Sequence, residues 1–169
     1  EARFDEFTYT DANGRAQPVR LASRVFGGWD NPAETRPPVV LLHGCPGSAA
    51  DFARLAPAIA ADGRRVVAID LPGFGASKDP VDDYSMRSFA HAVVELLKGR
   101  GLRAAHLVGW SNSGGVIVNA AHDDPDTVAS VTLLAAIGDQ RFEGSGSYTV
   151  EHVKYTLGLA VGVWAPELV

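Results

Sequence analysis

The apolar residues of the chain fall into short continuous runs that are separated by longer segments of mixed character. Four such runs occupy residues 39–42, 65–69, 105–108 and 128–137, and the last is most apolar at 131–135. A run this short fits a strand, and the lack of alternation is typical of a strand that is covered on both faces. We therefore predict four buried strands.

The segments between these runs carry apolar residues at helical spacing. In residues 51–61 and 86–99 an apolar residue recurs every three to four positions, as on one face of a helix. A third segment of this kind follows residue 111 and ends near His122, because residues 123–125 (Asp-Asp-Pro) stop a helix there. The sequence thus predicts three helices between the four strands.

The start of the chain differs from this pattern. Residues 4–9 and 19–26 read as two strands around a turn at residues 11–14 (Asp-Ala-Asn-Gly), which predicts an antiparallel pair at a sheet edge. Strands that alternate with helices over the rest of the chain predict an α/β fold. Its sheet should be mostly parallel and doubly wound, with helices on both faces. Ligands of such sheets lie beyond the carboxyl ends of the strands, where His43, Asp70 and Ser111 follow their strands.

Composition narrows the classes of function. The 169 residues are 46% hydrophobic and carry a net charge of −5, which indicates one globular domain and disfavours nucleic acid as a partner. The single cysteine, Cys45, excludes an internal disulfide and a cysteine-based zinc cluster. No segment approaches the roughly 20 apolar residues of a membrane span. We expect neither a cofactor nor a metal ion, and the compartment is left open.

One stretch, residues 105–118, combines a strand, a corner and the start of a helix. A chain that turns from strand to helix so abruptly needs a strained corner residue, and small neighbours that avoid clashes. Gly109 and Ser113, two residues before and after Ser111, meet this requirement. The corner would expose the Ser111 hydroxyl and leave the backbone N–H of Asn112 free, which is the logic of the G-x-S-x-G nucleophile elbow. The alternative is a Gly- and Ser-rich turn without chemistry.

Two further loops accompany this corner. They are His-Gly-Cys-Pro-Gly from His43, and Asp-Leu-Pro-Gly-Phe-Gly-Ala-Ser from Asp70. Together with Gly-Trp-Ser-Asn-Ser-Gly-Gly from Gly109, they resemble the α/β-hydrolase fold superfamily over roughly residues 4–137. The resemblance implies an eight-stranded, mostly parallel sheet in the complete family. It also implies acyl-transfer or related chemistry at the elbow.

The resemblance assigns roles to individual residues. Ser111 matches the nucleophile, and the N–H groups of Asn112 and Cys45 match the two oxyanion donors. Gly44 and Trp110 are the expected substrate-binding residues beside them. Family members that open epoxides or displace halide carry aspartate at the elbow, so Ser111 argues against those two reactions. We expect a serine hydrolase that acts on a small, largely apolar ester or related acyl substrate.

The triad base and acid are harder to locate. In the family the histidine follows the last strand, and too few residues follow Ser111 in this chain to supply the last strands and that loop. We therefore expect the histidine and the acid to lie outside this chain, in a C-terminal half or a second chain that completes the fold. A protein without a triad is the alternative. Asp139 is a candidate acid, because some members place theirs just after the corresponding strand.

The end of the chain changes character. We predict that residues 1–145 form the N-terminal part of the core domain and that residues 146–169 begin a helical cap. Residues 148–164 are apolar on much of their surface, as in a lid helix over an apolar pocket. A helix that binds a partner or a membrane surface is the alternative, but Lys154 is its single basic residue, which disfavours a membrane.

Several other polar residues have a structural interpretation as well as a catalytic one. We expect His43 to belong to the scaffold of its loop, His106 to lie in the core, and His91 and His122 to lie at the surface or a helix end. Asp70 is expected to hold the loop that follows it by accepting backbone hydrogen bonds. Two alternatives for the function stay open: a non-catalytic binding module with this fold, and carbon–carbon bond hydrolysis or acyl transfer at the same elbow.

Overall fold

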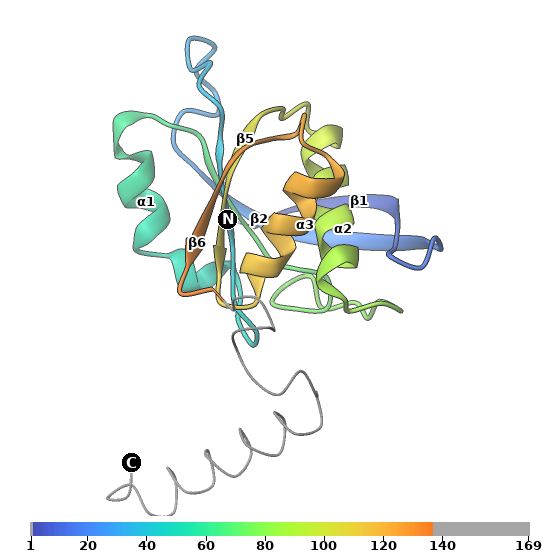
Figure 1. Ribbon diagram of the computed structural model, residues 1–169. Coiled ribbons are helices and arrows are strands. Elements are labelled where there is room, and N and C mark those ends of the chain that lie inside the picture. The colour runs from blue at the N-terminus through green and yellow to red at the C-terminus, as the bar shows by residue number, and fades with distance from the viewer. Residues whose placement is uncertain (1, 137–169) are drawn as a thin grey trace, which may run out of the picture. The chain divides into compact units, whose positions relative to one another are not determined.

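The computed structural model of the protein describes residues 2–136. In this part of the chain one sheet has the spatial order β1-β2-β4-β3-β5-β6 (Figure 1). Its strands are β1 (Ala2–Thr10), β2 (Ala16–Phe26), β3 (Val39–Leu42), β4 (Val66–Ile69), β5 (Ala105–Trp110) and β6 (Val128–Leu134). The helices are α1 (Leu55–Ile59), α2 (Met86–Gly99) and α3 (Ser113–Asp123), with two short 3₁₀ helices, η1 (Ala49–Phe52) and η2 (Ala60–Asp62).

The pairing of the strands confirms the predicted α/β sheet. β1 and β2 form an antiparallel pair at one edge, and β2 also runs antiparallel to β4. The pairs β3–β4, β3–β5 and β5–β6 are parallel. The carboxyl ends of β3, β4 and β5 therefore lie side by side at the same end of these parallel strands, where the three polar loops begin. We call this the carboxyl edge of the sheet.

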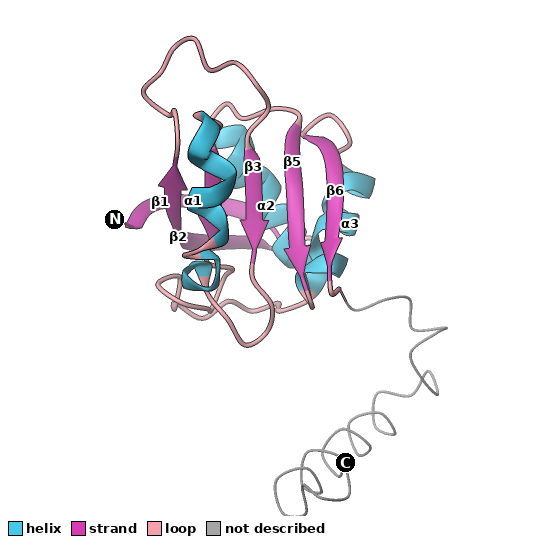
Figure 2. Ribbon diagram, turned by 90° about the vertical axis from the view of Figure 1, so that its left-hand side faces the viewer, coloured by secondary structure: helices cyan, strands magenta, loops and turns pink. Residues whose placement is uncertain are grey.

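The core lies on both faces of the sheet because successive strand residues point to opposite sides. In β3, Val40 and Leu42 pack in the cluster that contains α2 and α3, whereas Val39 and Leu41 pack with η1 and α1. Figures 1 and 2 show α1 on one face and the two longer helices on the other. This arrangement explains why β3 and β4 read as continuous apolar runs.

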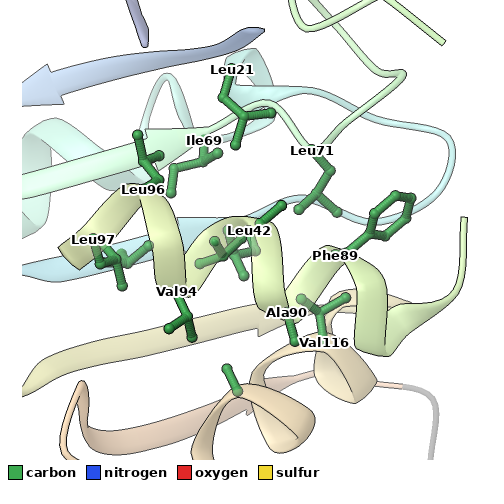
Figure 3. Packing of buried hydrophobic residues seen from close by; sticks show 14 of the residues in the cluster. Leu21, Leu42, Ile69, Leu71, Phe89, Ala90, Val94, Leu96, Leu97 and Val116 are labelled. Atoms are coloured by element: carbon green, nitrogen blue, oxygen red, sulfur yellow. The ribbon is translucent and has the colours of Figure 1, made fainter. Parts of the chain in front are cut away.

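The helix α2 fills much of the larger cluster. Ser85 caps its N-terminus, since the Ser85 hydroxyl accepts a hydrogen bond from the backbone N–H of Ser88 at 3.2 Å. Figure 3 shows Phe89, Leu96 and Leu97 of this helix packed among sheet residues such as Leu42 and Ile69. Burying a side chain of this size contributes about 1.5–3 kcal/mol, so α2 anchors one face of the sheet.

The helix predicted over residues 51–61 is wrong in detail. A capping box at Ser48 starts the first turn earlier, at Ala49, and the chain then forms η1, α1 and η2 in succession. Pro57 lies within α1. Proline lacks the N–H that a continuous helix would donate to residue 53, and its ring crowds that carbonyl. The segment is therefore divided between short helical pieces.

The strand predicted over residues 128–137 ends earlier, at Leu134. Ala135 has a φ of +42°, a left-handed conformation that does not continue a strand. β6 is the edge strand of the described sheet, and Leu133 is 57% exposed. The described part of the sheet therefore ends in a strand with exposed apolar side chains.

Two predictions fall outside the described residues. They are the domain boundary at residue 145 and the cap formed by residues 146–169. Among the helices of residues 2–136, none is long and apolar enough to cross a membrane.

Candidate active site

Ser111 lies at the corner between β5 and α3. Its φ of +53° is in the left-handed region, which a non-glycine residue seldom adopts. The strain of such a conformation is about 1–3 kcal/mol and is typical of functional sites. The backbone N–H of Ser111 donates to the carbonyl of Leu134 at 3.1 Å, which fixes the corner to the end of β6. The abrupt corner that the sequence predicts is present.

The corner depends on small neighbours. A Cβ placed on Gly109 would lie 2.3 Å from the carbonyl oxygen of Ser113 and 2.6 Å from its carbonyl carbon. These are backbone atoms, so no rotation of a side chain would relieve the clash. A Cβ on Gly44 would lie 3.1 Å from the Cβ of Ser111. The loop after β3 therefore approaches the corner closely because it carries glycine there.

Two backbone amides belong to the segments that meet at this corner. Asn112 is the N-cap residue of α3, and Cys45 follows Gly44 in the loop after β3. Neither N–H donates a hydrogen bond to another group within residues 2–136. Unpaired N–H groups at a helix start and in a tight loop are suited to binding an anion. The thiol of Cys45 is exposed.

His43 holds the loop after β3 together. Its ring is 1% exposed, Nε2 accepts from the backbone N–H of Leu71 at 3.0 Å, and Nδ1 is 2.7 Å from the carbonyl oxygen of Gly44. Because Nε2 accepts and the carbonyl can only accept, the proton lies on Nδ1. Phe74 packs edge-on against the ring. His43 has the structural role that we expect from the sequence, and neither ring nitrogen is available as a base.

Ser113 makes a contact that the sequence does not reveal. Its side chain is fully buried, and its hydroxyl donates to the carbonyl oxygen of His43. The bond joins the first turn of α3 to the loop after β3. From the sequence alone, Ser113 is only a small residue that the G-x-S-x-G motif tolerates in place of its last glycine. The hydroxyl itself is the signal that a partner lies nearby, since a buried hydroxyl needs one.

Asp70 holds two neighbouring segments. Its carboxylate accepts from the backbone N–H of Ala49 at 2.5 Å and of Ala76 at 2.9 Å. Gly75 has a φ of +53°, and a Cβ there would lie 2.5 Å from the carboxylate carbon of Asp70. Asp70 therefore holds the loop after β4, as we predict, and also the start of η1.

The remaining described histidines lie away from the corner. His91 contacts the carbonyl of Thr10 at 2.8 Å and the carboxylate of Asp123 at 3.1 Å, and His122 is exposed. The Ser111 hydroxyl has no hydrogen-bond partner among residues 2–136. The candidate acid Asp139 lies outside the described residues.

The prediction that His106 lies in the core is wrong. Its side chain is partly exposed and bonds at 2.8 Å to the hydroxyl of Ser130, its partner across the β5–β6 pair. His106 lies on the sheet face that α1 covers, and α1 packs against β4. In the described part of the chain no helix covers this face at β5 and β6.

Trp110 is the last residue of β5 and is 37% exposed. Its ring lies beside the loop after β3, since a Cβ on Gly44 would be 3.6 Å from the Cε3 atom of Trp110. The Trp110 side chain therefore borders the loop that carries Gly44 and Cys45. Within residues 2–136 there is no group of three or more His, Cys, Asp or Glu residues that could hold a metal ion.

The chain matches a known protein family over most of its length. The family model described as "alpha/beta hydrolase fold" matches residues 37–154, more than half of the chain. The chain belongs to the α/β-hydrolase fold family. The matched region begins just before β3 and includes the three loops at the carboxyl edge of the sheet.

The curated relatives of this α/β-hydrolase chain carry different names. The chain is 34% identical over 122 residues to the dihydrolipoyllysine-residue acetyltransferase component of an acetoin cleaving system from Pseudomonas putida (72% of this chain and 33% of that protein). It is 38% identical to a fluoroacetate dehalogenase of a Burkholderia species (60% and 34%). It is 41% identical to a pimeloyl-[acyl-carrier protein] methyl ester esterase of Methylococcus capsulatus (63% and 39%). The chain spans about a third of the length of these relatives.

Solved structures agree with the assignment to the α/β-hydrolase fold. A probable hydrolytic enzyme from Pseudomonas aeruginosa PAO1 superposes with a TM-score of 0.69 at 26% identity, over 82% of this chain and 42% of that one. An N-acyl homoserine lactonase in complex with N-butanoyl homoserine gives a TM-score of 0.65 at 26% identity, over 83% and 47%.

Proposed function

We propose that the complete protein is a serine hydrolase that acts on a small, largely apolar ester or related acyl substrate. Ser111 Oγ attacks the substrate carbonyl, the alcohol leaves, and water then hydrolyses the acyl-enzyme. The observation that carries the proposal is the left-handed conformation of Ser111 at the carboxyl end of β5, directly before α3. A strained serine at this position has a strand behind it and a helix start beside it, as a nucleophile elbow requires.

The proposed oxyanion hole consists of the backbone N–H groups of Asn112 and Cys45. Both are unpaired within residues 2–136, and they come from the two loops that meet at Gly44 and Ser111. The attack moves negative charge onto the carbonyl oxygen, and two fixed N–H groups stabilise that charge without reorganisation. Removing one such donor costs on the order of 10²–10³ in rate.

The general base is proposed to be a histidine outside residues 2–136. His43 and His91 use both ring nitrogens in other contacts, and His106 bonds to Ser130. His122 lies in the last turn of α3, at the end of that helix opposite Ser111. A base must reach the Ser111 hydroxyl to take its proton. Asp139 stays a candidate for the acid that would orient this histidine.

The elbow residue favours acyl chemistry among the reactions named for the relatives. These include a dehalogenase, an epoxide hydrolase and a methyl ester esterase. Opening an epoxide or displacing fluoride through a covalent intermediate needs a carboxylate that forms an ester with the substrate. Ser111 would form an ether there, which water does not readily cleave, but with an acyl group it forms an ester that water does cleave.

A fluorophosphonate probe tests this proposal on the complete protein. We expect stoichiometric labelling of Ser111 and turnover of short-chain aryl esters, with both lost in Ser111→Ala. Ser130→Ala is the matched control, since Ser130 is an exposed serine on β6, and it should keep both activities. A complete protein that resists the probe and shows no Ser111-dependent ester turnover would instead be a non-catalytic binding module.

A further inference from the structure

The hydrogen bond from Ser113 to His43 joins the two loops that form the proposed site. Ser113 lies two residues after Ser111, and His43 lies two residues before Cys45. The two ends are 70 residues apart in the sequence, and both side chains are at most 1% exposed. One buried contact therefore connects the segment that carries the nucleophile to the segment that carries the second proposed oxyanion donor.

Through the backbone of the loop, this contact affects the direction of the Cys45 N–H. The N–H of Cys45 belongs to the same planar peptide unit as the carbonyl of Gly44, so the direction of one fixes the direction of the other. The His43 ring holds that carbonyl through Nδ1, and Ser113 holds the carbonyl of His43 itself. Successive carbonyls at positions 43 and 44 are thus both fixed, which leaves the Cys45 N–H little freedom to turn.

We propose that Ser113 is a positioning residue, whose hydroxyl sets the Cys45 amide at the distance from Ser111 that oxyanion binding requires. The inference rests on the proposed role of Cys45. An oxyanion donor must lie within about 2.7–3.1 Å of the developing charge. A loop free to move by a fraction of an ångström loses that alignment while the protein stays folded. Glycine at position 113 would keep the corner and lose the contact with His43.

A purely structural role for Ser113 predicts something different. Loss of one neutral buried hydrogen bond lowers stability, but it would leave the Cys45 amide and the chemistry of the folded protein unchanged. The two roles are separated by watching the Cys45 amide directly. Selective ¹⁵N-cysteine labelling reports the N–H of each cysteine in the complete protein, and the signal that disappears in Cys45→Ser belongs to Cys45, the single cysteine of these 169 residues.

The experiment compares the complete wild-type protein with Ser113→Ala, Ser113→Cys and the control Ser130→Ala. In Ser113→Ala we expect the Cys45 amide signal to move and its hydrogen exchange to quicken. Fluorophosphonate labelling should slow by about tenfold, less than the 10²–10³ of removing a donor outright, and KM for an ester should change little. Ser113→Cys keeps a weak donor of similar shape and should restore part of the rate.

Each outcome decides the matter. An unmoved Cys45 signal in Ser113→Ala overturns the positioning role, whatever the labelling rate. If the Cys45 amide signal moves in Ser113→Ala but the fluorophosphonate labelling rate is unchanged, the hydrogen bond from Ser113 does not affect binding of the oxyanion, and the proposal is overturned. A wild-type protein that resists the probe overturns the proposed function and the oxyanion role together, and it is recognised because the wild type itself fails.

Discussion

Gly109 and Ser113 lie so close that a Cβ on Gly109 would be 2.3 Å from the Ser113 carbonyl oxygen. Real Cβ atoms do not approach backbone that closely, so an added methyl group must displace the start of α3 or the end of β5. We expect Gly109→Ala to lower the free energy of unfolding by about 1–3 kcal/mol, the usual cost of overpacking. Unfolding of the complete protein in urea measures this change.

The matched control is Gly99→Ala. Gly99 is the last residue of α2, and a Cβ there would have nothing within 4 Å. Alanine is favoured over glycine in a helix by up to about 1 kcal/mol, so the stability should be unchanged or slightly higher. Equal losses in Gly99→Ala and Gly109→Ala would contradict the steric explanation of the corner.

The elements of the fold could be predicted from the sequence where local pattern decides them. Uninterrupted apolar runs locate β3 and β4, because these strands are covered on both faces. The spacing of Gly109, Ser111 and Ser113 predicts the corner, because the steric requirement is local. The segment after Ser48 is different: its apolar spacing suggests one helix, and the capping box and Pro57 divide it.

The site could be predicted less completely, because its internal contacts join distant segments. The bond from Ser113 to His43 and the bond from Ala49 to Asp70 connect residues 70 and 21 positions apart. The sequence shows that these residues are polar or small, but not which backbone groups they meet. His106 shows the same limit, since its exposure depends on how far α1 extends over the sheet.

Asp70 should be sensitive to loss of its charge. Its two carboxylate oxygens accept from the N–H groups of Ala49 and Ala76 in a buried setting. In Asp70→Asn one of these N–H groups would face an NH₂ group, and donor against donor costs about 1–3 kcal/mol of stability. Urea unfolding measures this loss.

The control for Asp70 is Asp79→Asn. Asp79 is an exposed carboxylate in the segment after the same loop, and its conversion should change the free energy of unfolding by less than about 0.5 kcal/mol. If Asp70→Asn were as stable as Asp79→Asn, the two backbone contacts would contribute nothing measurable.

We expect ionisation of the Tyr9 hydroxyl to lower the stability of the protein at alkaline pH. Burial raises its pKa above the ordinary value of 10.0, and its hydroxyl lies 3.2 Å from the Ser88 hydroxyl. A raised folded-state pKa means that the unfolded chain ionises first. The stability that un-ionised Tyr9 contributes to the folded state is therefore fully present below pH 10.0, and it is lost as the pH rises through the folded-state pKa.

Tyr9→Phe should remove this part of the alkaline loss. At neutral pH the variant should lose about 0.5–1.5 kcal/mol, because the Ser88 hydroxyl loses its partner. Tyr84→Phe is the control at neutral pH. Tyr84 is 51% exposed and its hydroxyl accepts only a long hydrogen bond, 3.5 Å from the Val81 N–H, so loss of this hydroxyl should cost less stability than loss of the Tyr9 hydroxyl. Identical alkaline curves for the wild type and Tyr9→Phe would rule out Tyr9 as the cause.

We expect protonation of the Asp123 carboxylate to lower the stability of the protein at acid pH. The Arg87 guanidinium donates to both of its carboxylate oxygens, at 2.8 and 2.9 Å, and His91 lies 3.1 Å away. The hydrogen bonds from Arg87, followed by the contact with His91, lower the pKa of Asp123 below its ordinary 3.8. A lowered folded-state pKa gives stability that is present above pH 3.8 and is lost as the pH falls through the folded-state value.

Asp123→Asn should therefore be less stable than the wild type near neutral pH, and the difference should shrink as the pH falls below 3.8. Unfolding in urea between about pH 2 and pH 6 measures both curves. High salt should also reduce the difference, because the ion pair with Arg87 is partly exposed and ions screen it. The exposed Asp126, converted to Asn, is the control and should follow the wild-type curve. A difference between wild type and Asp123→Asn that persists at the lowest pH would show that the carboxylate charge is not its source.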